Sequence, residues 1–118
     1  MKPDLAVARL SALAQPSRLA VFRFLVQAGP DGACPADIAA RLDLGASTLS
    51  FHLKALAHAG LIVAEPAGRS IVYRAAFDAM RGLVDYLTEN CCGGAAAACA
   101  PRLPTRRERL SSMQSTRP

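Results

Sequence analysis

The chain has 118 residues, of which 52% are hydrophobic, and a formal net charge of +5. This length suits one small domain, and no apolar run reaches the roughly 18 residues that a membrane-spanning helix needs. The N-terminal stretch carries Asp4, Arg9 and Arg18 among its apolar residues, so it lacks the apolar core of a secretory signal. We therefore expect a cytoplasmic protein whose cysteines are reduced thiols rather than a disulfide framework.

The positive charge is concentrated at the C-terminal end. Residues 101–118 contain five Arg and one Glu, so the first 100 residues carry a net charge of only +1. A nucleic-acid-binding surface on the body of the protein must then be a local patch. The 101–118 segment is polar and Pro-flanked, which predicts a disordered basic tail, with a solvated terminus favoured over a specific DNA contact.

The first half of the chain predicts three helices. The first runs from about residue 4 to 14, and the second begins at Pro16 and ends at Gly29-Pro30. A third, short helix opens at Pro35 after a turn at residues 30–32. Helical periodicity gives the second and third helices buried faces, which are Leu19, Phe22, Leu25 and Val26, and Ile38, Ala39 and Leu42.

The second half predicts a helix, a hairpin and a last helix. A tight connection at residues 43–45, in which Gly45 is available for a positive φ, leads into a helix that Gly60 ends. Its apolar stripe is Leu49, Leu53 and Leu56. Period-two patterning then predicts strands at 61–65 and 71–75 around a turn at 66–70. The last helix runs from Phe77 to near Glu89, with one face made of Met80, Leu83, Val84 and Leu87.

This order predicts a mainly α protein with a small β-hairpin, arranged α-α-α-α-β-β-α. Two helices joined by a three-residue turn that contains glycine indicate a helix-turn-helix, and a hairpin directly after them makes it winged. We assign residues 1–90 to this domain, 91–100 to a cysteine-bearing segment and 101–118 to the tail.

The central part of the sequence resembles a known protein family. Residues 37–75, DIAARLDLGASTLSFHLKALAHAGLIVAEPAGRSIVYRA, look like the winged helix of ArsR/SmtB-type metalloregulatory repressors, and LSALAQPSRLAVFRFL is similar to their entry helices. The matching motifs, in order along the chain, are Ser47, Ser50, His52 and Leu53; Leu56, Ala59, Gly60 and Leu61; and Gly68, Arg69, Tyr73 and Arg74. The resemblance covers about residues 5–90. It implies a homodimer joined by the first and last helices, and a repressor that leaves operator DNA when a toxic metal or metalloid binds.

The helix after the turn supplies the predicted DNA-binding residues. Its outer face carries hydroxyls and a lysine, and no acidic residue occurs between Asp43 and Glu65. The predicted contacts on this helix are Ser47, Thr48, Ser50, Phe51, His52 and Lys54, and the resemblance implies a further contact by the wing-tip Arg69. The alternatives are a cap at Ser47, solvated charges at Lys54 and Arg69, packing at Phe51 and a half-buried histidine at His52. A symmetric dimer would read an imperfect inverted repeat.

Three of the four cysteines lie within nine residues: Cys91, Cys92 and Cys99. The resemblance offers two other inducer sites, and both look absent. The arsenic-type cysteine box on the third helix keeps only Cys34, with Ala36 and Ala39 at the other two positions. The zinc-type site on the last helix has Asp78, Asp85 and Glu89 but no histidine. Cys34 is expected to be a small buried residue at the cap of the third helix.

Three thiolates without His or carboxylate suit trivalent arsenic, which forms three-coordinate pyramidal complexes. Gly93-Gly94 would permit the non-helical backbone that adjacent cysteines need to turn both sulfurs inward. The expected inducer is arsenite, with antimonite or methylarsenite as variants, and no permanent cofactor is expected. Redox sensing, a Cd/Pb-type soft metal and simple filler are the alternatives.

An enzyme is disfavoured, because there is no Cys-x-x-Cys, no phosphate-cradling loop and no nucleophile with a partner base. A third hypothesis is a winged-helix interaction module that has lost DNA binding.

Overall fold

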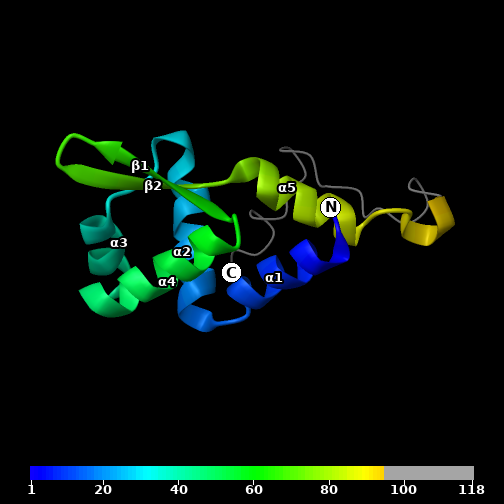
Figure 1. Ribbon diagram of the computed structural model, residues 1–118, viewed down its shortest axis with the longest axis horizontal. Coiled ribbons are helices and arrows are strands. Elements are labelled where there is room, and N and C mark those ends of the chain that lie inside the picture. The colour runs from blue at the N-terminus through cyan, green and yellow to red at the C-terminus, as the bar shows by residue number, and fades with distance from the viewer. Residues whose placement is uncertain (95–118) are drawn as a thin grey trace, which may run out of the picture. The chain divides into compact units, whose positions relative to one another are not determined.

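The computed structural model describes residues 1–94 and divides the chain into two units, Met1–Leu87 and Thr88–Pro118. The elements of the first unit are α1 (Pro3–Leu13), α2 (Pro16–Ala28), η1 (Gly29–Asp31), α3 (Pro35–Leu42), α4 (Ala46–His58), β1 (Ile62–Ala67), β2 (Ser70–Ala75) and α5 (Phe77–Leu87). The described part of the second unit contains the short helix η2 (Cys91–Gly94). The predicted fold class, a winged helix-turn-helix of order α-α-α-α-β-β-α, is confirmed (Figure 1). The compact unit ends at Leu87, slightly before the expected boundary at residue 90.

Prolines open the first three helices. Pro3, Pro16 and Pro35 each occupy a first-turn position, where the missing N–H costs nothing and the fixed φ suits a helix. Two hydrogen bonds donated by Arg18 stabilise the turn between α1 and α2. The Arg18 backbone N–H donates to Gln15 Oε1 at 2.7 Å, and Arg18 Nε donates to the Ala12 carbonyl, also at 2.7 Å.

Helix α2 lies at the centre of the first unit, where it contacts α1, α3, α4 and β2 (Figure 1). The core around it consists mainly of aliphatic side chains together with Phe22, and the largest fully buried ones are Val21, Leu25, Ile38, Leu56 and Leu61. The predicted stripe of α4 is confirmed, since Leu49, Leu53 and Leu56 are at most 2% exposed. The prediction for Leu19 is wrong. Its side chain is 42% exposed, and Val21 fills the corresponding place in the core.

The β1–β2 hairpin is the wing of this fold, and its turn is shorter than predicted. The strands extend to Ala67 and from Ser70, so the turn consists of Gly68 and Arg69 rather than all of residues 66–70. Gly68 has a φ of 64°, a conformation that favours glycine. Pro66 pairs with Ile71 in an edge strand, where a missing N–H is tolerated. An ion pair between Arg74 and Glu65 ties the two strands together.

A short segment after η1 anchors the hairpin to the helical core. Ala33 and Tyr73 exchange two backbone hydrogen bonds, each 2.9 Å long, and Arg74 Nη1 donates to the Pro30 carbonyl at 3.3 Å. Gly32, just before Ala33, lies against the backbone of β2, with a φ of 67°. The position of the wing is therefore fixed by the loop between α2 and α3 as well as by its own turn.

The connection between α3 and α4 places its positive φ at a different residue from the one predicted. Asp43 adopts the left-handed conformation, with a φ of 52°, while Gly45 has an ordinary φ of −66°. A short polar side chain such as Asp tolerates this region better than most residues do. The Leu44 N–H then donates to the Ala39 carbonyl at 3.0 Å and closes the end of α3.

The outer helices leave apolar side chains open to solvent in the single chain. On α5, Leu83 is buried and Met80 half-buried, but Val84 is 55% and Leu87 59% exposed. The exposed large apolar residues of α1 are Leu5, Val7 and Leu10. Helix α5 ends at Leu87, two residues before the predicted end. Within residues 1–94, no helix is both long and apolar enough to cross a bilayer.

Candidate nucleic-acid interface and thiol segment

The outward face of α4 carries five of the seven predicted DNA contacts. The side chains of Ser47, Thr48, Ser50, Phe51 and Lys54 are all exposed, because the leucine stripe on the opposite face fixes the rotation of the helix. Phe51 is 66% exposed, so it does not pack into the core of the single chain. The sixth contact, Arg69, is exposed in the hairpin turn.

The start of α4 is not capped by a side chain of the described residues. Gly45 is the N-cap residue, and no side chain within residues 1–94 accepts from the first turn. The alternative that Ser47 serves as the cap is therefore wrong. Its hydroxyl lies within the first turn of the helix, beside backbone N–H groups that have no partner within α4. Such a helix start favours an anionic oxygen, as a phosphate would supply.

His52 differs from its neighbours. Its side chain is only 6% exposed, and its Nδ1 has no hydrogen-bond partner among the described residues. The ring lies edge-on to that of Phe51, with the centroids 5.8 Å apart. This burial favours the packing alternative over a direct base contact.

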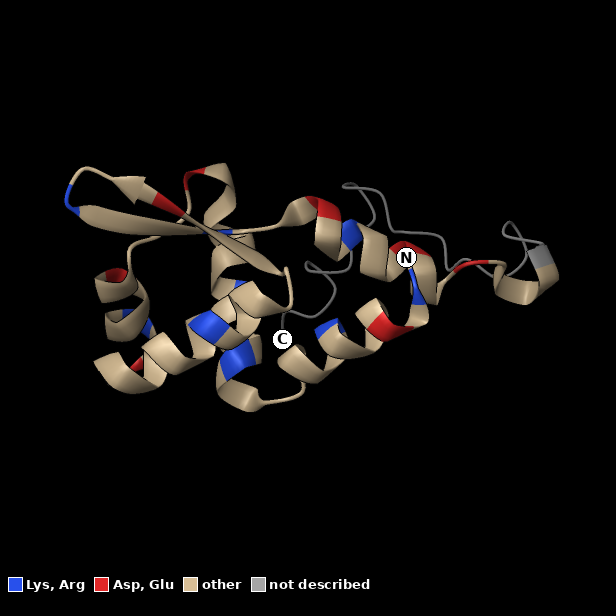
Figure 2. Ribbon diagram, in the orientation of Figure 1, with Lys and Arg blue, Asp and Glu red and all other residues tan. Residues whose placement is uncertain are grey.

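The positive charge on this surface is confined to a local patch, as the small net charge of the first 100 residues predicts. The hairpin tip and the middle of α4 carry basic residues, and α4 carries no acidic one (Figure 2). Among the described residues, Lys54 and Arg69 have no ion-pair partner, whereas Arg74 is engaged with Glu65. Lys54 and Arg69 are thus the cations that this surface offers to a polyanion.

Helix α1 contacts the far end of α4. Arg9 Nε donates to the carbonyl of Ala59, the C-cap residue of α4, at 3.1 Å. A cation at a helix C-terminus also interacts favourably with the helix dipole. The α4 helix is therefore held by the leucine stripe along its length and by Arg9 at its end.

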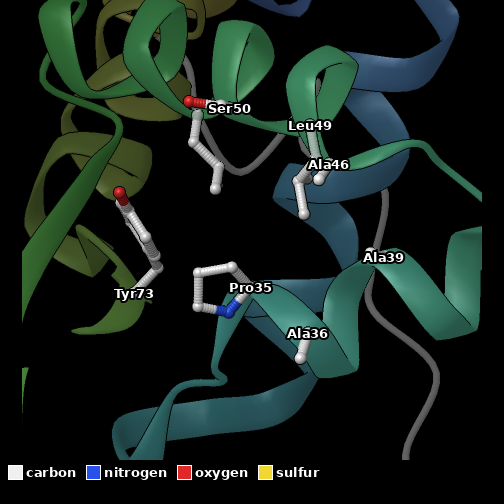
Figure 3. A pocket seen from close by; sticks show the side chains of 8 residues that line it. Pro35, Ala36, Ala39, Ala46, Leu49, Ser50 and Tyr73 are labelled. Atoms are coloured by element: carbon white, nitrogen blue, oxygen red, sulfur yellow. The ribbon is translucent and has the colours of Figure 1, made fainter. Parts of the chain in front are cut away.

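A half-open pocket of about 320 Å³ lies between α3, α4 and β2 (Figure 3). Its lining is Pro35, Ala36, Ala39, Ala46, Leu49, Ser50, Leu53 and Tyr73. No pattern in the sequence predicts this pocket. Ala36 and Ala39, where the resemblance would place thiols, contribute hydrocarbon to its wall. Cys34 is the N-cap residue of α3, as expected, but it is half-buried rather than buried.

The structure describes two members of the predicted thiol trio. Cys91 is half-buried and Cys92 is exposed, both in η2. Cys92 has a φ of 53° and Gly93 one of 68°, so the backbone here is non-helical, as predicted. Cys99 lies outside the described residues, and so does the tail. Residues 1–94 contain no cluster of three potential metal ligands. The three-thiol site therefore stays a prediction.

The chain is similar to known proteins both in sequence and in fold. A family described as a helix-turn-helix domain matches residues 13–64, which span α2, α3, α4 and the start of β1. An ArsR-like transcriptional regulator from Rhodococcus sp. RHA1 has the same fold, with a TM-score of 0.66 and 22% identity over 95% of this chain and 92% of that one. The chain therefore has a winged helix-turn-helix fold.

Two further solved structures are similar to the chain. The homodimeric winged helix-turn-helix DNA-binding domain of Mb0332 from Mycobacterium bovis is 29% identical, with a TM-score of 0.60 over 74% of this chain and 81% of that one. NolR from Sinorhizobium fredii is 26% identical, with a TM-score of 0.59 over 77% and 94% of the two chains. No curated protein sequence matches the chain.

Proposed function

We propose that the chain is a homodimeric transcriptional repressor of the ArsR type that binds operator DNA and leaves it when trivalent arsenic binds Cys91, Cys92 and Cys99. The observation that carries the DNA-binding part is the exposed polar row on α4. A buried leucine stripe turns hydroxyls and Lys54 outward, beside an uncapped helix start and within a stretch free of acidic residues. Such a helix suits the major groove, with Arg69 of the wing on the backbone or in the minor groove.

Homodimerisation is supported by the apolar faces that α1 and α5 leave open. Leu5, Val7 and Leu10 on α1 and Val84 and Leu87 on α5 are each at least 40% exposed in the single chain. Exposed large apolar side chains in such number are typical of an interface. The similar domain of Mb0332 is homodimeric. A twofold dimer would place two α4 helices in successive major grooves, about 34 Å apart, on an imperfect inverted repeat.

The DNA-binding proposal predicts the effect of removing single charges. Lys54→Gln and Arg69→Gln are each expected to weaken binding to promoter DNA, and each should reduce the slope of log affinity against log salt by about 1. Fluorescence anisotropy over a range of salt concentrations measures both quantities. Arg23→Gln, an exposed charge on α2, is the control and should change neither by as much. Equal losses in all three variants would indicate a general charge effect and contradict the proposed surface.

The inducer proposal rests on thiol chemistry. Soft thiolates select soft acceptors, and Gly93-Gly94 with the Ala run gives the segment little steric obstruction. The segment follows α5, whose apolar face is part of the proposed interface. Ligation there would change the angle between the protomers, so that both α4 helices could no longer dock together. The expected coupling is about 1–3 kcal/mol, or roughly 5–150-fold in operator affinity.

Arsenite titration of the protein–DNA complex tests the thiol site. Wild-type protein should release DNA, while Cys91→Ser, Cys92→Ser and Cys99→Ser should bind DNA normally and lose the response. Cys34→Ser is the matched control and should respond like wild type, because Cys34 lies at the cap of α3. If all three variants release DNA as wild type does, the site is wrong. Release by peroxide and recovery with dithiothreitol, without any arsenite response, would favour the redox alternative, and release by Cd²⁺ or Pb²⁺ alone would favour a soft-metal sensor.

A further inference from the structure

The pocket between α3, α4 and β2 is a feature that the proposed function does not use. At about 320 Å³ it is at the small end of the range for small-molecule sites. Six of its eight lining residues are apolar, and they come from both helices of the helix-turn-helix: Pro35, Ala36, Ala39, Ala46, Leu49 and Leu53. Alanine at three of these positions leaves room that larger side chains would fill.

The other two lining residues supply hydroxyl groups. Tyr73 on β2 forms one side of the pocket, and its hydroxyl end points toward α4, where Ser50 lies (Figure 3). Among the described residues, neither side-chain hydroxyl has a hydrogen-bond partner. The backbone of Tyr73 is fixed by its two bonds to Ala33, so the ring is held in place. The pocket thus combines apolar walls with two polar groups near one another.

The lining also indicates the charge of a ligand. None of the eight residues is ionisable near neutral pH, so a charged group in the pocket would lose hydration without gaining a counterion. A neutral molecule avoids that cost. Its apolar body would gain from burial, and one hydroxyl or carbonyl would replace water at Tyr73 and Ser50.

We propose that this pocket binds a small, neutral, mainly apolar molecule with one hydroxyl or carbonyl group, of about the size of a naphthol, and that this ligand competes with DNA. Ser50 is the link, because it lines the pocket and also belongs to the exposed row of α4. The competition with DNA rests on the proposed function, whereas ligand binding does not. Because coupling is reciprocal, DNA should weaken ligand binding by the same factor.

The test titrates the full chain with 2-naphthol, indole and acetophenone, with binding followed by intrinsic or ligand fluorescence and by calorimetry. At least one neutral probe should bind saturably with a dissociation constant below about 1 mM. The anion 2-naphthoate should bind at least tenfold more weakly than 2-naphthol. Failure of all three neutral probes to saturate, or equal binding of 2-naphthoate, overturns the proposal.

Pocket variants locate the binding. Ala39→Leu, which fills the inner wall, should weaken binding at least tenfold, while Ala40→Leu, on the exposed face of the same helix, should leave it unchanged. If Ala39→Leu fails to fold by circular dichroism, Ala36→Leu at the exposed rim replaces it. Tyr73→Phe removes only the hydroxyl and should weaken 2-naphthol binding about 2- to 12-fold. Unchanged affinity in the filling variant overturns the assignment to this pocket.

The effect on DNA is read separately. Saturating probe should lower affinity for promoter DNA at least fivefold in wild type and not in Ala39→Leu. If the probe binds but DNA affinity stays the same, the competition is wrong. If wild-type protein binds no promoter DNA at all, the proposed function fails, while the ligand titration still decides whether the pocket is a binding site.

Discussion

Gly32→Ala should lower the free energy of unfolding of the first unit by about 2–6 kcal/mol. Gly32 has a φ of 67° and a ψ of −160°, a region that is essentially restricted to glycine and costs other residues about 1–3 kcal/mol. A Cβ there would also overlap the Tyr73 carbonyl and Arg74 Cγ and approach Val72 Cγ1 to 2.9 Å, which adds about 1–3 kcal/mol of overpacking. Urea denaturation followed by circular dichroism measures the loss.

Gly29 offers a closely matched control for this substitution. It has nearly the same backbone conformation, with a φ of 76° and a ψ of −159°, but a Cβ at this position would meet no atom within 4 Å. Gly29→Ala should therefore show only the conformational cost, about 1–3 kcal/mol. The difference between the two variants isolates the contact between Gly32 and β2. Equal losses would contradict the close approach of the loop to the wing.

Leu56→Ala is the other substitution with a large expected effect, a loss of about 2–5 kcal/mol in the free energy of unfolding. Leu56 is fully buried in the middle of the core. Truncation removes its buried surface and leaves a cavity that close-packed neighbours fill only in part. Since small domains are stable by about 5–15 kcal/mol, this change should lower the melting temperature by many degrees. Thermal and urea denaturation would both report it.

Leu19→Ala controls for the chemistry of the Leu56 change. The same atoms are removed from a helix, but the Leu19 side chain is already 42% exposed. Its expected cost is below about 1 kcal/mol. A loss at Leu19 as large as that at Leu56 would mean that α2 is rotated relative to the structure, with Leu19 in the core as the sequence first suggested.

The error at Leu19 shows the limit of helical periodicity. In α2, Leu19 lies three residues before Phe22 and Val21 lies four residues before Leu25, so a helical stripe through Phe22 and Leu25 can include either of them. The contacts of α2 with four other elements decide between them, and those contacts join residues far apart in the chain. In α4 the three leucines leave no comparable choice, and there the prediction was correct.

Turns were predicted less well than helices, because more than one residue could satisfy the same backbone requirement. Between α3 and α4 the sequence has both Asp43 and Gly45, and glycine was preferred for its lower conformational cost. The structure places the left-handed residue at Asp43, directly at the end of α3. In the wing, Pro66 suggested a wider turn, but a two-stranded sheet has only edge strands, which accept proline.

The candidate DNA-binding site could be predicted in part from the sequence. Once the stripe of α4 is known, the exposed positions follow, and five of the seven predicted contacts lie on that face. The burial of His52 was left open, since it borders the stripe. The pocket could not be predicted, because its walls join residues from Pro35 to Tyr73 through tertiary packing alone. Cys99 and the basic tail lie beyond the described residues, so those predictions stand as they were made.

The hydrogen bond from Arg9 to Ala59 ties α1 to the end of α4, the helix proposed to contact DNA. A purification tag that displaces α1, or a deletion that removes it, would take away the guanidinium at the end of α4 and expose the Ala59 carbonyl. The partner of Arg18 would go as well, because Ala12 belongs to the same helix. A tag should therefore leave α1 in place when binding to DNA is compared between variants.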